Sequence, residues 1–526
     1  MTSMNRRSFV TSMLALLGGA GPALLGGQIL GMRPANAETV DPRPGPALSE
    51  EATPFSLEGL QEMARKLSEQ GFSERPEIPA AWREMSYDQY RAIWFNSNRA
   101  LWQGTEKPVR VDFFAPGAYY TRPVEINIVS GAESRTVLFD YDLFKKGEQA
   151  PELPIDDTLG YSGFRLRGAV AGPGEYKEFL VFQGASYFRA IARGENYGLS
   201  ARGLGIRTAD ERGEEFPAFT KFWIVEPKAG DTVTTIHALL DSPSTTGIYT
   251  FEAEPGDATT INVRATLYPR TDMDHVGIAP LTSMFLFDET NRNRFDDFRP
   301  AVHDSDGLLV WNGAGEVLWR PLANPKTLQV SDFMDHNPKG FGLMQRSRKF
   351  SDFADLEALY HTRPSLWIEP GADWGDGAVA LVEIPADKEI YDNIVAYWRP
   401  KDVIPAGKPY EFSYRMFWDG EPILGRDVAR VINTRLGRNH HGEGYTVTVD
   451  FAAHDLLPAN PRDVQVSLSD NRGTVKDGII QRNPETGGLR LAFHFVPGDA
   501  SSIEMRAQLS KDGQVISETW LYRWTA

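Results

Sequence analysis

The chain has 526 residues, a formal net charge of −16 and no cysteine. The lack of cysteine excludes disulfides, thiolate zinc sites, iron–sulfur clusters and a cysteine nucleophile. The acidic charge disfavours nucleic acid and anionic membranes as partners and favours neutral or cationic ones. A chain of this length is expected to form two or more domains, with its stability supplied by a large core.

The first 37 residues are predicted to be an export signal. The paired arginines Arg6 and Arg7 precede an apolar, glycine-rich run over residues 13–32, and residues 35–37 give a small-x-small cleavage pattern. Paired arginines followed by phenylalanine indicate the twin-arginine route. A membrane anchor is the alternative, but glycine and proline interrupt the run. We therefore expect export to the periplasm. No later apolar run is long enough to span a bilayer.

The rest of the chain is predicted to be mostly β. After a loose leader over residues 38–54, short helices are expected near residues 56–71 and 86–94. Segments that alternate or run apolar, broken by glycine and proline, then predict the strands of a large antiparallel β-sandwich. These segments lie at residues 109–114, 124–129, 136–141, 178–182, 219–225, 232–240, 247–253, 260–268 and 410–418.

A second series of short alternating strands begins at residue 445 and has the size of an immunoglobulin-like sandwich. We therefore expect the large sandwich over residues 55–425, a basic, polar linker over residues 426–444 and the small domain over residues 445–526. The predicted fold class is all-β, since the chain has neither a βαβ rhythm nor a repeat of fixed period.

Two carboxylates are the candidates for acid–base chemistry. Asp304 is crowded by His303 and Asp306, and Asp392 directly precedes an apolar run over residues 394–398. A carboxyl group at the mouth of such a strand is partly desolvated, which raises its pKa toward that of a usable acid. Hydrolysis of a glycosidic bond needs one such acid and one ionised base. The alternative is that Asp304 and Asp306 cap a turn and that Asp392 bonds loop amides.

The segment His303-Asp304-Ser305-Asp306 also allows a metal-binding interpretation. A metal site usually needs three convergent ligands, and nothing nearby repeats a metal-ligand spacing. We therefore expect no metal, and nothing in the chain requires a cofactor.

Flat rings beside polar, glycine or proline residues are candidates for stacking on sugar rings, whereas rings inside strand runs are expected in the core. The expected core rings include Phe179, Phe182 and Phe222. The candidate sugar-binding residues are Trp311, Tyr360, Trp367, Trp374 and Trp398, with Arg363 and Glu369 among them as hydrogen-bonding groups.

Several longer stretches are distinctive as motifs. They are GASYFRA (184–190), YGLSARG (197–203), GIAPLTSMF (277–285), HDSD (303–306), NPKGFGL (337–343), RPSLWIEP (363–370), DNIV (392–395) and SETWLY (517–522). In this order they resemble the periplasmic proteins G and D of osmoregulated periplasmic glucan biosynthesis. The likeness extends from about residue 55 to the C-terminus, and the paired arginines favour the D branch.

The resemblance implies a large, mutarotase-like antiparallel β-sandwich with a sugar-binding cleft, followed by a small immunoglobulin-like sandwich. It also implies an inverting endo-β-1,2-glucanase or a transglycosylase that acts on β-1,2-glucan. By motif, the general acid falls on Asp392 and the general base on Asp304, with Ser305 and Tyr360 at proton-relay positions. The alternative is a non-catalytic protein that escorts or organises nascent glucan, and a membrane glucosyltransferase is a candidate partner.

One departure from the family pattern follows the large sandwich. Relatives of the D branch carry a longer, tryptophan-containing insertion there, whereas residues 435–444 are short in this chain. If that insertion covers the cleft, this chain is expected to have a more open site, weaker activity or a different product.

Overall fold

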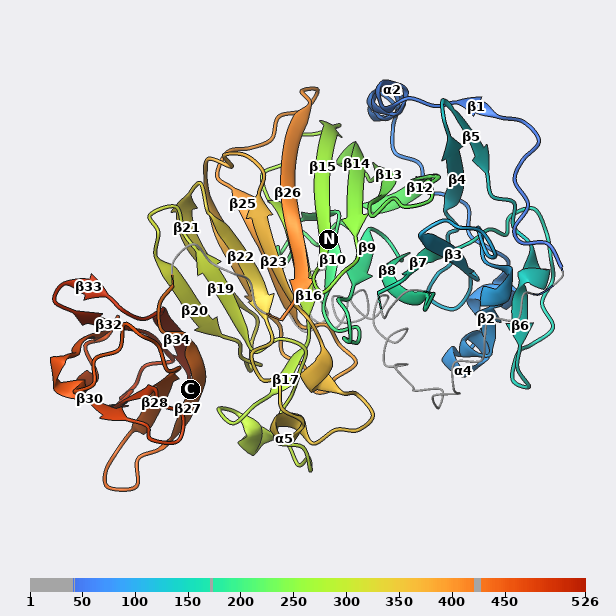
Figure 1. Cartoon of the computed structure of the whole chain (residues 1–526). Coiled ribbons are helices and arrows are strands. Elements are labelled where there is room, and N and C mark those ends of the chain that lie inside the picture. Colours follow the sequence, from blue (N-terminus) through green and yellow to red (C-terminus); the bar gives the residue numbers. More distant parts are fainter. Residues whose placement is uncertain (1–40, 42, 171–173, 421–426) are drawn as a thin grey trace, which may run out of the picture.

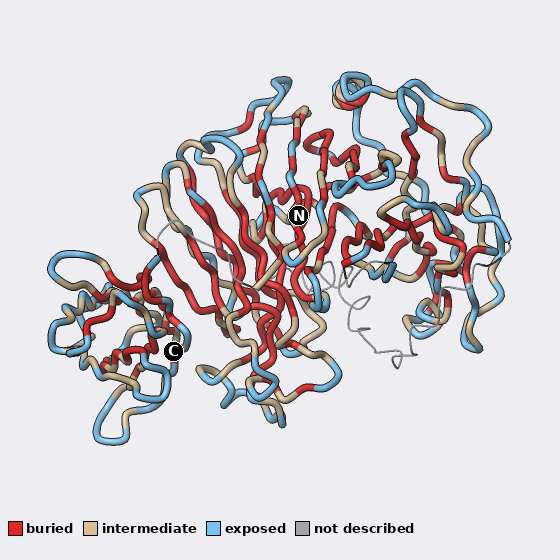
Figure 2. Tube along the Cα trace, viewed as in Figure 1, coloured by how far each residue is buried: buried red, intermediate tan, exposed pale blue. Residues whose placement is uncertain are grey.

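The computed structural model describes residues 41, 43–170, 174–420 and 427–526; the predicted export signal lies outside this part. Two large sheets fill the middle of the molecule, and a small domain lies at one end (Figure 1). Buried residues concentrate in the two large sheets and in the strands of the small domain (Figure 2). The prediction of an all-β fold is confirmed.

The larger sheet has sixteen strands, which come from both halves of the chain. Most neighbours in it are antiparallel, as β14 and β15 are, but β12 pairs with β4 in parallel. In spatial order the strands are β1 (Thr53–Pro54), β5 (Glu133–Thr136), β4 (Glu125–Ser130), β12 (Ala218–Val225), β13 (Thr234–Asp241), β14 (Thr245–Glu254), β15 (Thr259–Pro269), β26 (Tyr410–Asp419), β23 (Ser365–Pro370), β22 (Gly340–Met344), β19 (Gly307–Trp311), β20 (Val317–Pro321), β34 (Thr519–Thr525), β32 (Ser502–Lys511) and β29 (Gln465–Asp470), with β33 (Gln514–Val515) beside β32.

The second sheet has ten strands and is antiparallel throughout. In spatial order its strands are β21 (Gln329–His336), β24 (Asp376–Glu383), β25 (Ile394–Pro400), β16 (Val276–Ser283), β10 (Ser200–Arg202), β9 (Tyr187–Ala190), β8 (Lys177–Gln183), β7 (Gly163–Gly168) and β3 (Val109–Phe114), with β11 (Leu204–Ile206) beside β16.

Short elements complete the described part. The small domain adds a four-stranded sheet of β27 (Val431–Arg438), β28 (Tyr445–Phe451), β31 (Leu489–Phe495) and β30 (Val475–Arg482). Two strand pairs are β17 (Phe285–Phe287) with β18 (Val302–His303) and β2 (Ile93–Phe95) with β6 (Phe144–Lys146). The helices are α2 (Leu57–Ser68), α3 (Ala80–Arg83), α4 (Tyr87–Arg91) and α5 (Phe350–Phe353), with 3₁₀ turns at Ser97–Arg99, Tyr141–Leu143, Arg292–Arg294, Tyr360–Thr362 and Pro461–Asp463. In the described ranges, no helix is long and apolar enough to cross a membrane.

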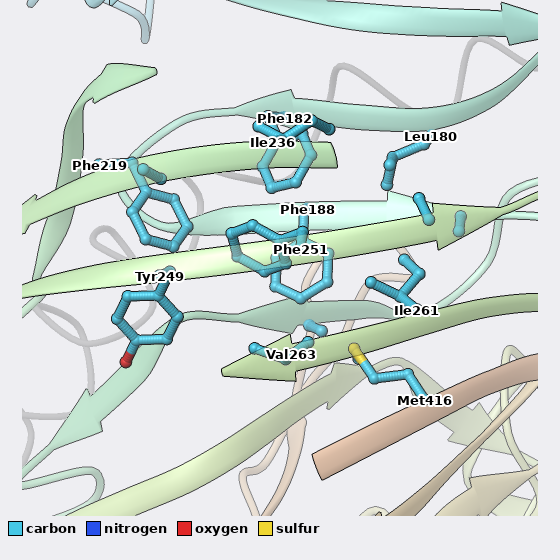
Figure 3. Close-up of a cluster of buried hydrophobic side chains, with 14 of the residues drawn as sticks. Leu180, Phe182, Phe188, Phe219, Ile236, Tyr249, Phe251, Ile261, Val263 and Met416 are labelled. Atoms are coloured by element: carbon cyan, nitrogen blue, oxygen red, sulfur yellow. The ribbon is translucent and has the colours of Figure 1, made fainter. Parts of the chain in front are cut away.

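The main core lies between the two large sheets. Leu180 and Phe182 of β8 meet residues of the larger sheet such as Phe251 of β14 (Figure 3). The rings of Phe182 and Phe251 pack edge to face with their centroids 5.1 Å apart. Phe179 and Phe222 are also buried, so the expected core rings are confirmed. These large aromatic groups supply much of the apolar burial that a cysteine-free chain needs.

The opposite face of the ten-stranded sheet is polar over β7 to β10. Side chains alternate along a strand, so Leu180 and Phe182 enter the core while Gln183 lies on the other face. Arg165 of β7 and Arg189 of β9 share that polar face. The strand period thus carries two arginines to one surface of the sheet, where they line a cavity.

The small domain is joined to the larger sheet by backbone pairing. β34 pairs in parallel with β20, with Leu318 opposite Thr519 and Trp319 opposite Trp520. A buried ion pair reinforces this junction, since the guanidinium of Arg346 lies 2.6 Å from the Glu518 carboxylate. The large sheet therefore continues from one domain into the next.

Of the segment expected to be a linker, residues 426–444, the part that the structure describes, residues 427–444, belongs largely to the small domain. β27 runs through it and pairs with β28 from Arg438 opposite Tyr445 back to Val431 opposite Phe451. Val431 is buried in the core of the small domain. The basic composition hid this strand, because its polar side chains lie on the exposed side while its backbone bonds are made to β28. The short segment after the sandwich is thus a hairpin, whose tip spans residues 439–444.

Candidate functional site

A cavity of about 900 Å³ lies against the polar face of β7 to β9. A smaller cavity of about 30 Å³ shares Arg189, Tyr197, Arg363 and Glu389 with it. The smaller one is also lined by Gly198, Met284, Asp304, Tyr360, Ile390 and Asp392. The two predicted acid–base carboxylates, 88 positions apart in sequence, therefore lie on one small cavity that adjoins the large one.

Asp304 is a buried carboxylate that is ion-paired with Arg363. Its backbone N–H donates to the Met284 carbonyl oxygen (2.8 Å), which extends the pairing of β17 with β18. Burial raises the pKa of Asp304, and the positive charge of Arg363 acts in the opposite direction. The direct guanidinium contact favours the ionised form of this carboxyl group.

Asp392 has a different environment. Its Oδ2 atom is buried and accepts no hydrogen bond from the described residues, and the nearest guanidinium, that of Arg189, lies 3.7 Å away. Burial raises the pKa of Asp392, with Arg189 opposing the shift and Asp304 adding to it. A carboxyl group that is desolvated, weakly paired and close to another acid is suited to hold a proton.

Asn393 fixes the backbone next to Asp392. Its amide Nδ2 donates to the carbonyl oxygens of Phe285 (2.9 Å) and Ile384 (3.0 Å), and its Oδ1 accepts from the Phe285 N–H (2.8 Å). The residue next to Phe285, Met284, receives the backbone hydrogen bond of Asp304. One buried amide therefore holds the two acidic segments in register.

Arg363 is itself held from several sides. It stacks over the Tyr360 ring at 4.2 Å and donates through Nη2 to the Ala358 carbonyl oxygen (3.1 Å). A Cβ atom at position 198 would lie 2.9 Å from the Arg363 side chain, so Gly198 allows this close approach. Contacts with Tyr360, Ala358 and Gly198 therefore hold the Arg363 side chain in its orientation toward Asp304.

Tyr360 and Ser305, the predicted relay residues, have different surroundings. Tyr360 lines the small cavity. Its hydroxyl donates to Glu389 Oε2 (3.0 Å), which also accepts from Arg299 (2.7 Å). The Ser305 hydroxyl is buried and bonds to the Ser283 hydroxyl (2.9 Å). Tyr360 thus shares the small cavity with both acids, whereas Ser305 lines neither cavity.

The neighbouring His303 is structural. Its Nδ1 lies 2.9 Å from Gln345 Oε1, and burial lowers its pKa to about 3. The imidazole is therefore neutral in the folded protein at ordinary pH. In the part of the chain that the structure describes, no group of three or more histidine, aspartate or glutamate side chains is placed to hold a metal ion.

Five predicted sugar-binding residues do not line either cavity. Trp367 of β23 is buried against the small domain, because its neighbours Leu366 and Ile368 occupy the main core on the opposite face. Trp398 is fully buried in the main core. Trp374 is partly buried against the same core, with its ring 6.1 Å from that of Trp398. The remaining two are Trp311, which packs on the small-domain core beneath Lys339, and Glu369, which lies opposite Arg415 in the sheet.

Several cavity residues escaped the sequence analysis. Arg189, Glu389, Arg299 and Tyr197 all line the large cavity. A lone arginine in an apolar strand was the available signal for Arg189, since such a residue must find a partner or line a polar space. For Glu389 and Arg299, which are in loops, the chain offers no periodic signal.

Comparisons with known proteins identify a matching family and similar relatives. The family described as "Periplasmic glucan biosynthesis protein, MdoG" matches residues 55–524. Glucans biosynthesis protein G of Shewanella sp. (strain MR-4) is 45% identical over 473 residues, which cover 90% of this chain and 87% of that protein. The protein of the same name from Shewanella frigidimarina (strain NCIMB 400) is 44% identical over 474 residues, covering 90% and 85%.

Both relatives are named for the G branch, whereas the paired arginines favoured the D branch. Those arginines lie outside the described residues, so the branch remains a prediction. The match over residues 55–524 confirms the resemblance stated from the motifs. The family name implies the periplasm and a part in glucan biosynthesis. The chain belongs to the periplasmic glucan biosynthesis protein family.

Proposed function

We propose that this protein acts on β-1,2-glucan chains as an inverting endo-β-1,2-glucanase or a related transglycosylase, with Asp392 as the general acid and Asp304 as the general base. One observation carries the proposal. Two buried carboxylates share a cavity. One is hydrogen-bonded and ion-paired with Arg363, whereas the nearest guanidinium to the other lies 3.7 Å away, beyond hydrogen-bonding distance. Carboxyl groups in such unequal environments suit the two roles in glycoside hydrolysis.

In the proposed reaction, Asp392 donates its proton to the glycosidic oxygen as the bond from that oxygen to the anomeric carbon breaks. Water attacks the anomeric carbon from the other face and gives its proton to Asp304. A relay through Tyr360 requires its hydroxyl, which donates to Glu389 in this structure, to donate to Asp304 instead. A direct path requires carboxyl groups roughly 6.5–9.5 Å apart, and a relay relaxes this limit. When a sugar hydroxyl replaces water, the same steps give transglycosylation.

The walls of the large cavity support a neutral, hydroxyl-rich substrate. Arg165 lies between Asp112 (2.9 Å) and Glu178 (2.5 Å), so opposite charges face the cavity together. Such alternating donors and acceptors can hydrogen-bond sugar hydroxyls without demanding a charged ligand. The proposed setting is the periplasm, reached by the twin-arginine route, with a membrane glucosyltransferase as the source of nascent chain.

A non-catalytic glucan escort is the second candidate. The names of the relatives refer to biosynthesis and specify no hydrolysis. The same cavity would then bind nascent chain and organise it. The two functions differ in whether Asp392 is needed for turnover or only for binding.

The test uses purified mature protein and linear β-1,2-glucan, with product analysis and calorimetric binding in parallel. Asp392→Asn and Asp304→Asn are compared with the wild type and with Asp402→Asn, an exposed control. The enzyme function predicts short linear or cyclic products from the wild type and the control, and binding without turnover by the two site variants. Binding without product by all four proteins would contradict the enzyme function and favour the escort.

A further inference from the structure

Two apolar side chains stand exposed on the cavity of about 900 Å³. Phe298 is 79% exposed and Leu356 is 76% exposed, and both line that cavity. An apolar side chain left in water forgoes the free energy that burial would supply. Exposed apolar groups on a binding cavity mark a surface that a ligand covers.

The backbone on both sides of Phe298 is fixed. The Arg292 side chain donates to the carbonyl oxygens of Asp297 (2.8 Å) and Arg299 (3.1 Å). The Arg299 side chain then donates to Asp355 Oδ2 (2.9 Å). The phenyl ring is thus carried on a braced loop, which lowers the cost of ordering it when a ligand binds.

The segment that carries Leu356 is braced in the same way. Ala354 (φ 54°) and Leu359 (φ 48°) flank it in the left-handed region, which is uncommon for residues with a Cβ atom. Asp355 Oδ1 accepts from the backbone N–H groups of residues 357 and 358, both at 2.8 Å. Backbone strain held by such contacts is characteristic of ligand-binding segments. The Arg299–Asp355 ion pair joins this segment to the Phe298 loop.

We propose that Phe298 and Leu356 form an apolar platform on which a pyranose ring of the glucan chain stacks, away from the bond that reacts. This inference rests on the proposed binding of glucan in the cavity. A pyranose ring offers an apolar C–H face to a phenyl ring and hydroxyls at its edge to the polar walls. Neither Phe298 nor Leu356 touches the small cavity of Asp304 and Asp392. The platform therefore adds affinity for long chains and leaves the chemical step unchanged.

The test measures binding of linear β-1,2-glucan polymer and of β-1,2-linked glucose disaccharide by calorimetry, in the Asp392→Asn background. Phe298→Ala should weaken polymer binding by about 3- to 10-fold, the loss of one ring contact, while leaving disaccharide binding unchanged. Phe298→Trp should restore polymer binding. Met334→Ala is the matched control, because Met334 is 71% exposed and lines neither cavity.

In the active protein, Phe298→Ala should raise KM for polymer with kcat unchanged. Equal polymer affinity in Phe298→Ala and Met334→Ala, with turnover intact in the wild type, would overturn the platform and leave the enzyme function standing. Weaker polymer binding in Phe298→Ala, with no turnover by the wild type, would support the platform on a glucan escort. A wild type that binds no glucan would overturn both proposals.

Discussion

The guanidinium of Arg189 lies 3.7 Å from the carboxylate of Asp392, beyond hydrogen-bonding distance. Arg363, by contrast, forms a direct hydrogen-bonded ion pair with Asp304. The two acids therefore differ in how strongly a cation stabilises their charged forms, although both are buried. The proposed division into acid and base depends on this difference.

Removal of the Arg189 charge should shift the pH dependence of turnover. Arg189 lowers the pKa of Asp392, so Arg189→Gln should raise that pKa. A general acid works while it is protonated, and the alkaline limb of kcat/KM should therefore move to higher pH. The pH profile measures this, with Arg193→Gln as the control, since Arg193 pairs with exposed Asp257. An unmoved alkaline limb would argue against Asp392 as the acid.

The loss of the Asn393 side chain should loosen the site. Asn393→Ala removes three buried hydrogen bonds, so the free energy of unfolding should fall by about 3 kcal/mol. Turnover should fall more than tenfold because the Asp392 segment is no longer held to Phe285. Urea unfolding and initial rates measure the two effects, and Asn262→Ala at an exposed strand position should change neither. Unchanged turnover in Asn393→Ala would show that the hydrogen bonds of the Asn393 side chain do not position the acid.

The small domain should matter for the site as well as for stability. Glu518 accepts from the Arg346 guanidinium (2.6 Å) and from the Val431 N–H (2.7 Å), and the Arg346 backbone N–H donates to Asp306 (2.9 Å). Glu518→Ala removes one partner of a buried ion pair, which should cost about 3–5 kcal/mol of unfolding free energy.

Arg346→Met combined with Glu518→Leu should recover part of that loss, because both charges are then gone. Turnover by the folded double variant should still fall, since the contact that joins the small domain to the Asp306 segment is altered. Urea unfolding and turnover of the two variants test this. Full turnover in the double variant would show that the ion pair at the domain junction does not affect the site.

The extent to which the sequence predicted the fold depended on local patterns. The alternation that predicted strands at residues 178–182 and 219–225 corresponds to β8 and β12, because period-two burial is visible without knowledge of partners. β27 was missed because its bonds to β28, and not its composition, make it a strand. The candidate acids were also found from local sequence, since motifs indicated Asp304 and Asp392. The structure places both on one small cavity.

The tryptophans show what a single chain cannot reveal. Trp367 lies beside glycine and proline-rich segments in sequence, which resembled a binding surface. Its actual environment depends on which face of β23 the small domain covers, and this contact joins residues far apart in the chain. Trp398 likewise enters the main core because of its register against β24, opposite Val379.

The stability of the protein should decline as pH rises through the acidic range, in part because of Asp306. Burial raises the pKa of Asp306 to about 6, above the ordinary value of 3.8. The folded state therefore binds the proton more tightly than the unfolded chain, and stability falls between about pH 4 and pH 6. The contribution is about 3 kcal/mol for a shift of this size.

Asp306→Asn should remove this part of the pH dependence, because an amide keeps an acceptor for the N–H groups of Arg346 and Ser347 without titrating. Urea unfolding at pH 4 and pH 7 measures the difference for the variant and the wild type. An identical decline in both proteins would assign the pH dependence to other buried acids, such as Asp288, whose pKa burial raises to about 7.

The assignment of the acid and the base is tested most directly with a substrate whose leaving group needs no proton. We would measure turnover of β-1,2-glucan and of a dinitrophenyl β-1,2-glucooligosaccharide by Asp392→Asn and Asp304→Asn. We predict that Asp392→Asn loses about 10²- to 10⁴-fold in turnover of glucan but stays near wild-type turnover of the aryl substrate, while Asp304→Asn fails on both. Equal losses of Asp392→Asn on the two substrates, or rescue of Asp304→Asn by the aryl group, would contradict it.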